Sequence, residues 1–269
     1  MFQFAGSIVN RIPSFRRGFN RWFYQFLAGI DRDGEVTLMN YGYIPPSDTK
    51  PISLSPSDEP NRLCLQLYHH VASGFDLKGH SVLEVGSGRG GGAVYVNKTF
   101  NPATMTGVDY SERAVAFCQH THRDAGLNFV HGDAESLPFE DNRFEAALNV
   151  ESSHCYGSMR RFLSEVYRVL KPGGHLLWAD FRSADDEAHV DHDIREVGFN
   201  VRHAAAITDN VVASMTQQGE RYRSLIERKV PRFAQGIFNQ YAGVDGSLIF
   251  HRMKTGDMVY LHRVLSKPA

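Results

Sequence analysis

The chain has 269 residues, of which 42% are hydrophobic and 22% charged, a composition that is typical of folded globular proteins and excludes a disordered chain. Its formal net charge of −1 gives no electrostatic case for a nucleic-acid partner. No apolar run reaches the roughly 18–20 residues of a membrane-spanning helix. The three cysteines (Cys64, Cys118 and Cys155) have no paired spacing. We therefore expect reduced thiols in a cytoplasmic protein.

The first 30 residues combine four arginines with eight aromatic side chains and contain no acidic residue. The arginines interrupt the hydrophobic run that a signal peptide requires. The helically spaced aromatics are Phe15, Phe19, Trp22, Phe23 and Phe26. This spacing predicts an amphipathic helix, whose aromatic face either packs on the domain or contacts a membrane surface. We favour packing, with peripheral membrane contact as the alternative.

Residues 31–60 contain five prolines and predict an irregular connector, which a helix from about Asn61 to Ser73 follows. Strands and helices then alternate. The predicted strands are 81–85, 105–108, 127–131, 144–150 and 175–181, and the predicted helices between them are 91–99, 111–125 and 159–170. Lys171-Pro172-Gly173-Gly174 predicts a sharp turn before the last of these strands. Such alternation is typical of a parallel sheet with helices on both faces.

Beyond Arg182 the alternation is looser, and the elements are more helical. The pattern predicts helices over 185–197, 210–229 and 233–241, and strands over 199–207 and 258–265.

A glycine-rich turn follows the strand at 81–85, in the order Gly86-Ser87-Gly88-Arg89-Gly90. Glycines at such a turn let a ligand approach the backbone, because no Cβ stands in the way. Glu84 precedes the first glycine, and Asp109 ends the next strand, where a carboxylate suits the hydroxyls of a ribose. A nucleoside cofactor is predicted, and these residues alone would also fit NAD.

The stretch after the third strand separates the two cofactors. His131-Gly132-Asp133-Ala134-Glu135-Ser136-Leu137-Pro138-Phe139, together with the glycine turn, Asp109 and Arg168 to Gly174, resembles the class I S-adenosylmethionine-dependent methyltransferases. The resemblance is strong over residues 60–182. It implies that Asp133 accepts from the adenine amine and that the Ala134 N–H faces the ring. The cofactor-binding residues that it implies are Glu84, Gly86, Ser87, Gly88, Gly90, Asp109, Tyr110, Asp133, Ala134 and Asn149.

The same resemblance implies an α/β fold with a doubly wound, seven-stranded, mostly parallel sheet whose last strand, 258–265, is antiparallel. Three parts are expected: an N-terminal helix and cofactor-covering loop (1–60), a cofactor-binding core (61–182), and a helical acceptor-pocket insertion with the final strands (183–269). In the first part, Tyr41 and Tyr43 resemble a segment that folds over the methionine portion of the cofactor. A phenol can donate to its carboxylate and a ring can face its sulfonium. Two packed tyrosines are the equally weighted alternative.

Catalytic residues are expected after the fourth strand, where open α/β sheets collect their ligands. Methyl transfer requires the acceptor to be aligned and, where necessary, deprotonated. His154 is the predicted base, and Glu151 could orient or polarise it, although a structural histidine is an equally weighted alternative. Cys155 is expected to pack. The histidines and aspartates at 189–193 predict a solvated helix face, so no metal is expected.

The acceptor is suggested by a closer resemblance. Residues 149–156, residues 58–62 and the aromatic, basic N-terminus are similar to mycobacterial lipid O-methyltransferases, including phthiotriol-type, glycopeptidolipid-type and fatty-acid enzymes. This implies transfer to a hydroxyl or carboxylate oxygen of a hydrophobic lipid or fatty acid. A methyltransferase of a smaller sterol, quinone or polyketide, and a non-catalytic cofactor-binding scaffold, are the alternatives. The sequence leaves the oligomeric state open.

Overall fold

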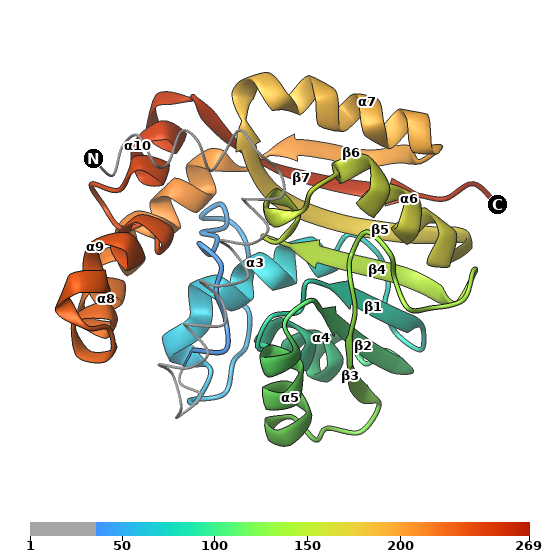
Figure 1. Cartoon of the computed structure of the whole chain (residues 1–269), viewed down its shortest axis with the longest axis horizontal. Helices are drawn as coiled ribbons and strands as arrows, with labels where there is room; N and C mark the ends of the chain where they lie inside the picture. The colour runs from blue at the N-terminus through green and yellow to red at the C-terminus, as the bar shows by residue number, and fades with distance from the viewer. Residues whose placement is uncertain (1–35) are drawn as a thin grey trace.

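The computed structural model describes residues 36–269, so the helix predicted near the N-terminus and its membrane alternative lie outside the described residues. A seven-stranded sheet runs through the molecule in the order β3-β2-β1-β4-β5-β7-β6 (Figure 1). The strands are β1 (Ser81–Val85), β2 (Thr104–Asp109), β3 (Leu127–His131), β4 (Phe144–Val150), β5 (Leu170–Ser183), β6 (Asn200–Ala206) and β7 (Met258–Ser266). Among these seven strands, only β7 runs antiparallel to its neighbours, β5 and β6. The predicted fold is confirmed.

Helices cover both faces of the sheet. They are α3 (Arg62–Ala72), α4 (Gly91–Phe100), α5 (Glu112–Thr121), α6 (Met159–Val169), α7 (Glu187–Val197), α8 (Thr208–Lys229), α9 (Arg232–Tyr241) and α10 (Leu248–Thr255). Neighbouring strand residues alternate between two hydrophobic cores, as the pleat requires. Val82 and Leu177 lie in the core beneath α3, α4 and α8, whereas Leu83 and Leu176 lie in the core beneath α6 and α7.

Two elements differ from the prediction. The fifth strand begins at Leu170, which pairs with Phe144, and His175 then pairs with Ala146. Residues 171–174 therefore form a bulge within the strand, and the prediction of a turn before it was wrong. The helix α10 was not predicted, although its signals are in the sequence: the Ser247 hydroxyl accepts from the Phe250 N–H, and Gly256 ends the helix at a φ of 83°.

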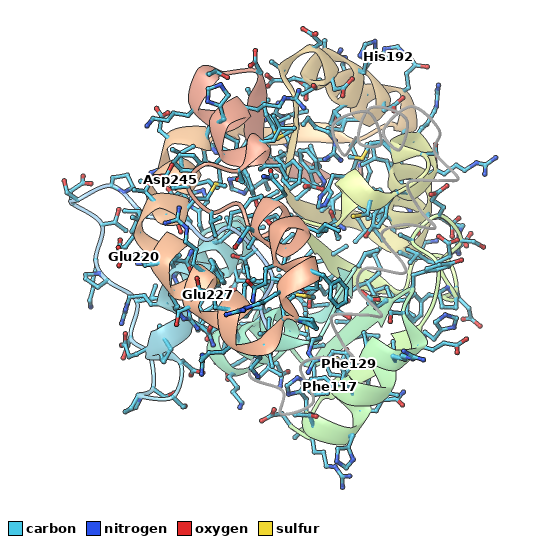
Figure 2. The ribbon with its side chains drawn as sticks, turned by 60° about the vertical axis from the view of Figure 1, so that its left-hand side comes forward. Phe117, Phe129, His192, Glu220, Glu227 and Asp245 are labelled. Atoms are coloured by element: carbon cyan, nitrogen blue, oxygen red, sulfur yellow. The ribbon has the colours of Figure 1, made fainter. Side chains whose placement is uncertain are left out.

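The carboxyl ends of β1, β2, β4 and β5 meet at one edge of the sheet, and α8 and α9 lie beyond that edge (Figure 1). In the rotated view, Phe117 and Phe129 mark the α5 end of the molecule and Glu220 and Glu227 mark α8 (Figure 2). Between residues 36 and 269, every helix is too short or too polar to cross a membrane.

Candidate active site

The glycine turn after β1 adopts a conformation that other residues rarely adopt. Gly86, Gly88 and Gly90 have φ values of 77°, 53° and 81°. The N–H groups of Gly86 and Ser87 both donate to the carbonyl of Val108 at the end of β2, at 2.8 and 3.1 Å. A Cβ added at Gly86 would stand 2.3 Å from the hydroxyl oxygen of Ser152. Glycine at this position therefore allows Ser152 and Tyr156 to pack directly against the turn, where a side chain would displace them.

Asp109, at the end of β2, holds two backbone segments together. Its Oδ2 accepts from the Gly88 N–H and its Oδ1 from the Ser111 N–H, both at 2.8 Å. Burial raises the pKa of this carboxyl, and the two N–H donors oppose that rise. Each carboxylate oxygen has a further lone pair, so Asp109 can accept from ligand hydroxyls while it still holds the turn.

A cavity opens along the carboxyl ends of β1, β2 and β4. Counted with its open mouth it encloses about 1250 Å³ of empty space. Its walls include residues Thr37 to Asn40, which precede α3, and the first part of the glycine turn. They also include Glu151, Ser152, Cys155 and Tyr156, which follow β4. The predicted cofactor-binding residues that line it are Gly86, Ser87, Gly88, Asp109, Tyr110, Asp133 and Ala134. Three glycine-turn residues and the residues that end β2 and β3 therefore meet at one cavity.

Two other predicted cofactor residues are buried around the glycine turn. The Glu84 side chain is 1% exposed, and its Oε1 accepts from the Tyr68 hydroxyl at 2.7 Å. Burial raises the pKa of Glu84 to about 8. Gly90 begins α4, where an added Cβ would meet His122 and Phe129 at 2.8 Å. Both positions support the shape of the turn from behind.

Asn149, a further predicted cofactor residue that does not line the cavity, is fully buried and fixes the cavity floor. Its Nδ2 donates to the carbonyl of Val85 at 2.9 Å, to the Ser152 hydroxyl at 2.7 Å and to the Tyr156 hydroxyl at 3.0 Å. Ser152 and Tyr156 line the cavity. Asn149 thus positions two lining hydroxyls against the end of β1.

The cover segment, residues 37–44, crosses the cavity mouth and is bonded at several points. The carbonyl of Thr37 accepts from the Gly91 N–H, and that of Tyr41 accepts from Ser214 and Gln218 of α8. Met39 and Asn40 line the cavity. The Tyr41 ring instead contacts Phe181, with centroids 5.6 Å apart.

Tyr43 lies farther along the cover segment and is buried. Its ring stacks on His70 at 4.3 Å, and its N–H donates to the carbonyl of Leu63. The structure therefore separates the two predicted tyrosines: the Tyr41 ring contacts Phe181 of β5, whereas Tyr43 packs on α3, and neither lines the cavity.

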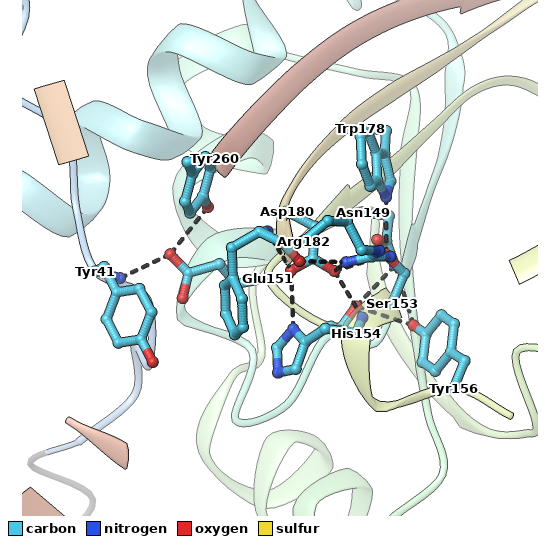
Figure 3. A network of polar contacts seen from close by, with 12 residues as sticks. Tyr41, Asn149, Glu151, Ser153, His154, Tyr156, Trp178, Asp180, Arg182 and Tyr260 are labelled. Carbon is cyan, nitrogen blue, oxygen red and sulfur yellow. Dashed lines mark hydrogen bonds and ion pairs between the residues drawn. The ribbon is translucent and has the colours of Figure 1, made fainter. Parts of the chain in front are cut away.

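Glu151 lines the cavity directly after β4 and has a φ of 47°, in the left-handed region that favours glycine. Its Oε1 accepts from the backbone N–H of Tyr41 at 2.8 Å and from the Tyr260 hydroxyl at 2.9 Å (Figure 3). Burial raises its pKa to about 8, against these two donors. Glu151 joins the cover segment to β7, and it is Asp180 that bonds the His154 ring.

His154 lies in the short helix Ser153–Cys155, next to Cys155 and two residues after Ser152, which both line the cavity, while His154 itself is not among the lining residues. Its ring Nδ1 lies 2.8 Å from Oδ1 of Asp180, and its backbone N–H donates to Oδ2 of the same carboxylate (Figure 3). Burial would lower the pKa of His154, but the adjacent Cys155 and the Asp180 carboxylate outweigh burial and raise it to about 10. The ring also stacks on Phe181 at 4.2 Å.

Asp180 is fully buried at the end of β5 and is held on several sides. Its Oδ2 accepts from the Ser153 hydroxyl at 2.6 Å and lies 3.1 Å from the Arg182 guanidinium. Ser153 in turn accepts from the Trp178 indole (Figure 3). Burial opposes ionisation, but His154 and Arg182 hold the pKa of Asp180 well below its usual range. A fixed carboxylate therefore faces the histidine ring.

Asp180 was missed from the sequence, although a signal was present: it is a lone acid at the carboxyl end of an apolar strand, as Asp109 is. The predicted solvated face on α7 includes Asp191, which accepts from Arg263. Within the described range of 36–269, no group of three or more His, Cys, Asp or Glu side chains is placed to hold a metal ion.

Comparisons with known proteins agree with this geometry. A family model described as a methyltransferase domain matches residues 83–178. The chain is 37% identical over 249 residues to the phthiotriol/phenolphthiotriol dimycocerosates methyltransferase of Mycobacterium tuberculosis, covering 92% of this chain and 91% of the relative. It is 41% identical over 220 residues to the fatty-acid O-methyltransferase of Mycolicibacterium smegmatis, covering 81% and 79%.

Solved structures show the same fold at low identity. The cyclopropane synthase MmaA2 of Mycobacterium tuberculosis matches with a TM-score of 0.70 at 10% identity, over 89% of this chain and 95% of that one. The cyclase SpnF matches with a TM-score of 0.71 at 22% identity, over 92% and 94%. These likenesses support the fold alone. The family rests on the sequence relatives: the chain belongs to the S-adenosylmethionine-dependent methyltransferases, in the family of the mycobacterial phthiotriol/phenolphthiotriol dimycocerosates methyltransferases.

Proposed function

We propose that this enzyme transfers a methyl group to an oxygen atom of a hydrophobic lipid or fatty acid, with His154 acting on that oxygen. The observation that carries the proposal is the His154–Asp180 pair, 2.8 Å apart, in which His154 directly precedes Cys155, a residue that lines the cofactor cavity. The names of the relatives, which include a fatty-acid O-methyltransferase, support an oxygen acceptor and a lipid.

The residues of the cavity fit S-adenosylmethionine. We propose that Asp109 accepts from the ribose hydroxyls, that Asp133 and Ala134 face the adenine, and that Gly86 to Gly88 present backbone near the amino-acid portion. Glu84, Gly90 and Asn149 would act indirectly, through the shape of the turn and the cavity floor. When bound, the cofactor would supply an electrophilic sulfonium methyl group for in-line attack by the acceptor oxygen, with the thioether S-adenosylhomocysteine as the leaving group. The protein supplies alignment, exclusion of water and control of the acceptor proton.

The charge of His154 distinguishes the two oxygen acceptors. A fatty carboxylate is ionised at neutral pH, because an ordinary carboxyl group titrates near pH ~4.3, and it needs only to be held in place. An imidazolium with Nδ1 on Asp180 can donate from Nε2 to that carboxylate, and a pKa of about 10 keeps the ring in this form. A hydroxyl requires the neutral ring as a base. The raised pKa thus favours a carboxylate acceptor.

The dependence of kcat on pH tests this choice, because the two acceptors predict opposite slopes. With a carboxylate, turnover is retained at neutral pH and falls as pH rises through the raised pKa of His154, since the donor is lost. With a hydroxyl, turnover increases with pH towards that pKa, since the base becomes available. The His154→Ala variant should lose the pH-dependent limb in either case while its cofactor affinity is unchanged.

A product assay tests the proposal as a whole. The protein is incubated with methyl-labelled cofactor and with separate lipid and polar extracts, and the labelled product is then treated with mild base to detect a methyl ester. Label in the lipid fraction supports the proposal when chromatography assigns it to a long-chain lipid or fatty acid, whereas label on a sterol or quinone in that fraction, or in the polar fraction alone, would favour a smaller acceptor. Label in neither fraction, with cofactor binding intact, would favour a scaffold without this activity.

A further inference from the structure

Two large apolar side chains are exposed on the helices beyond the sheet. Phe233, in the first turn of α9, is 87% exposed, and Leu248, at the start of α10, is 63% exposed. The Leu248 N–H donates to the Gln240 side chain at 2.7 Å, and Gln240 lies seven residues after Phe233, on the same face of α9. The two side chains therefore flank one exposed helix face.

The opposite side of α9 explains why this face is exposed. Ile226 and Val230 of the α8 end pack against Ala234 and Phe238 of α9, in a small core separate from the two cores of the sheet. The pair of helices thus forms a projection with its own buried side, and Phe233 lies outside it. A single exposed apolar residue needs no explanation, but two large ones on one outer face indicate an interaction surface.

The charge around this projection is positive in a chain whose overall formal charge is −1. From the start of α8 to the residue after Gly256 (208–257), the seven cations are Arg221, Arg223, Arg228, Lys229, Arg232, Arg252 and Lys254, and the five carboxylates are Asp209, Glu220, Glu227, Asp245 and Asp257. Arg232 is itself exposed and directly precedes Phe233. Apolar side chains beside cations suit an anionic lipid surface, where the rings enter the interface and the cations meet the headgroups.

The projection is connected to the cavity. Ser214 and Gln218, in the first half of α8, donate to the carbonyl of Tyr41 in the cover segment. A Cβ added at Gly243, between α9 and α10, would meet Met215 of α8 and the Tyr41 ring at 2.5 and 2.9 Å. The exposed face therefore belongs to the same helical unit that holds the cover segment at Tyr41.

We propose that the outer face of α9 and the start of α10, carrying Phe233, Leu248 and Arg232, docks on an anionic phospholipid surface. Its use in catalysis rests on the proposed lipid acceptor, since docking would bring the cavity to the layer in which that acceptor is dissolved. The docking itself does not depend on the acceptor and can be measured without turnover.

The test is flotation of the full-length protein with vesicles of phosphatidylcholine alone and of equal parts phosphatidylcholine and phosphatidylglycerol. The protein should float with the anionic vesicles, less so at high salt. The double variant Phe233→Ser, Leu248→Ser should bind at least about tenfold more weakly, because two apolar side chains no longer enter the interface. Arg232→Glu should weaken binding about fivefold or more, as expected for one cation near such a surface.

Matched controls lie elsewhere on the molecule. Val201, on the edge strand β6, is 46% exposed, so Val201→Ser removes an exposed apolar side chain away from α9. Lys78 is an exposed cation before β1, at the opposite edge of the sheet, so Lys78→Glu makes the same charge change there. Both variants should bind anionic vesicles as the wild type does.

Three results would overturn the docking proposal: no binding of the wild type to either vesicle, equal binding by the double serine variant, or self-association through α9 that the double variant abolishes without any vesicle binding. Vesicle binding that depends on Phe233 but is accompanied by no methyl transfer to lipids would leave docking intact and overturn the proposed function instead. Where both hold, the double variant should lose turnover with vesicle-borne acceptor but keep it with a short, water-dispersed one.

Discussion

The two halves of the candidate site are built in different ways. On the cofactor side, short-range motifs do most of the work: Asp109 holds Gly88 and Ser111, and the strand ends follow one another along the chain. On the acceptor side, distant segments converge on single carboxylates. Glu151 joins Tyr41, 110 positions away, to Tyr260, 109 positions away, whereas the contact of Asp180 with His154, across 26 positions, spans about as much chain as that of Asp109 with Gly88, across 21.

This difference has a functional consequence. A glycine turn that is held by Val108 and Asp109 at the end of β2 can be shared by enzymes with different acceptors, because these contacts do not involve Glu151 or Asp180. The acceptor side depends on tertiary contacts, so exchanges in the cover segment, β5 or α8 can alter it without changing the turn. Variants that break one half should therefore leave the other measurable.

The largest effect is expected for Gly86→Ala on the cofactor side. The added Cβ would lie 2.3 Å from the Ser152 hydroxyl and 2.7 Å from that of Tyr156, at a φ of 77°. Overpacking costs about 1–3 kcal/mol and the left-handed conformation about 1–2 kcal/mol more. The backbone strain lowers stability, as it does at Gly79, whereas the overpacking displaces the cavity-lining residues Ser152 and Tyr156, so cofactor affinity should fall by about a hundredfold. Calorimetric titration with cofactor measures it.

Gly79→Ala is the matched control for that variant. Gly79 has a φ of 75°, but nothing lies within 4 Å of an added Cβ. This variant should lose stability through backbone strain alone and bind cofactor normally. Equal affinity of the Gly86→Ala and wild-type proteins would contradict the assignment of the turn to the cofactor.

On the acceptor side, Asp180→Asn should lower kcat by about a hundredfold and leave cofactor affinity unchanged. The neutral amide lacks the negative charge that raises the pKa of His154. Its NH2 group would also face a group that now donates to Asp180, either the Ser153 hydroxyl and the His154 N–H or the His154 ring. The pH profile separates this from a structural effect: its limb should move to lower pH. An unmoved limb would show that Asp180 does not set the charge of His154.

Ser153→Ala tests the same pair more mildly. It removes the 2.6 Å hydrogen bond to Asp180 but leaves the carboxylate and its contact with His154. We expect a severalfold loss of kcat with the position of the pH limb nearly unchanged. A loss as large as that of Asp180→Asn would indicate that packing in the network, and not the carboxylate charge, controls His154.

The sequence predicted the fold well, and seven of the predicted cofactor residues line one cavity, because the signals for both are local. Periodicity locates strands, and positive-φ glycines reveal a turn, as at Gly86 and Gly88. The bulge at 171–174 was misread because its proline and glycines indicate an interruption but do not say whether the strand resumes on the same partner. The pairing of Leu170 with Phe144 depends on how β4 and β5 meet in the folded sheet, which the local sequence does not indicate.

The surroundings of His154 were predicted only in part, because the contacts there depend on tertiary pairing and not on local signals. His154 was identified from its place after β4, but its partner was sought three residues away, at Glu151. The structure instead pairs it with Asp180 of the neighbouring parallel strand, which only the register of β4 and β5 brings close. The contact of Glu151 with Tyr260 depends on the antiparallel insertion of β7 and has no local signal.

Glu151→Gln sharpens the comparison through stability. The folded-state pKa of Glu151 is raised from 4.5 to about 8, so between those values the folded protein retains a proton that the unfolded chain releases. Stability from this group is complete at low pH and falls as pH rises towards 8, by about 2–4 kcal/mol. Glutamine keeps the acceptor for Tyr41 and Tyr260 and removes the slope. Urea unfolding at pH 5 and pH 8 measures the difference between the two proteins.

The smallest effect is expected where α8 meets the cover segment. Ser214→Ala removes one of two donors to the Tyr41 carbonyl, and Gln218 keeps the other at 3.2 Å. The loss should be about 1 kcal/mol, appearing as a severalfold weaker affinity for the acceptor with kcat little changed. Thr216→Ala, on the exposed side of the same helix, should change neither quantity, because its hydroxyl bonds only the Val212 carbonyl of its own helix. If Ser214→Ala weakened cofactor and acceptor binding equally, the cover segment would serve both halves of the site, and the division between them would have to be drawn elsewhere.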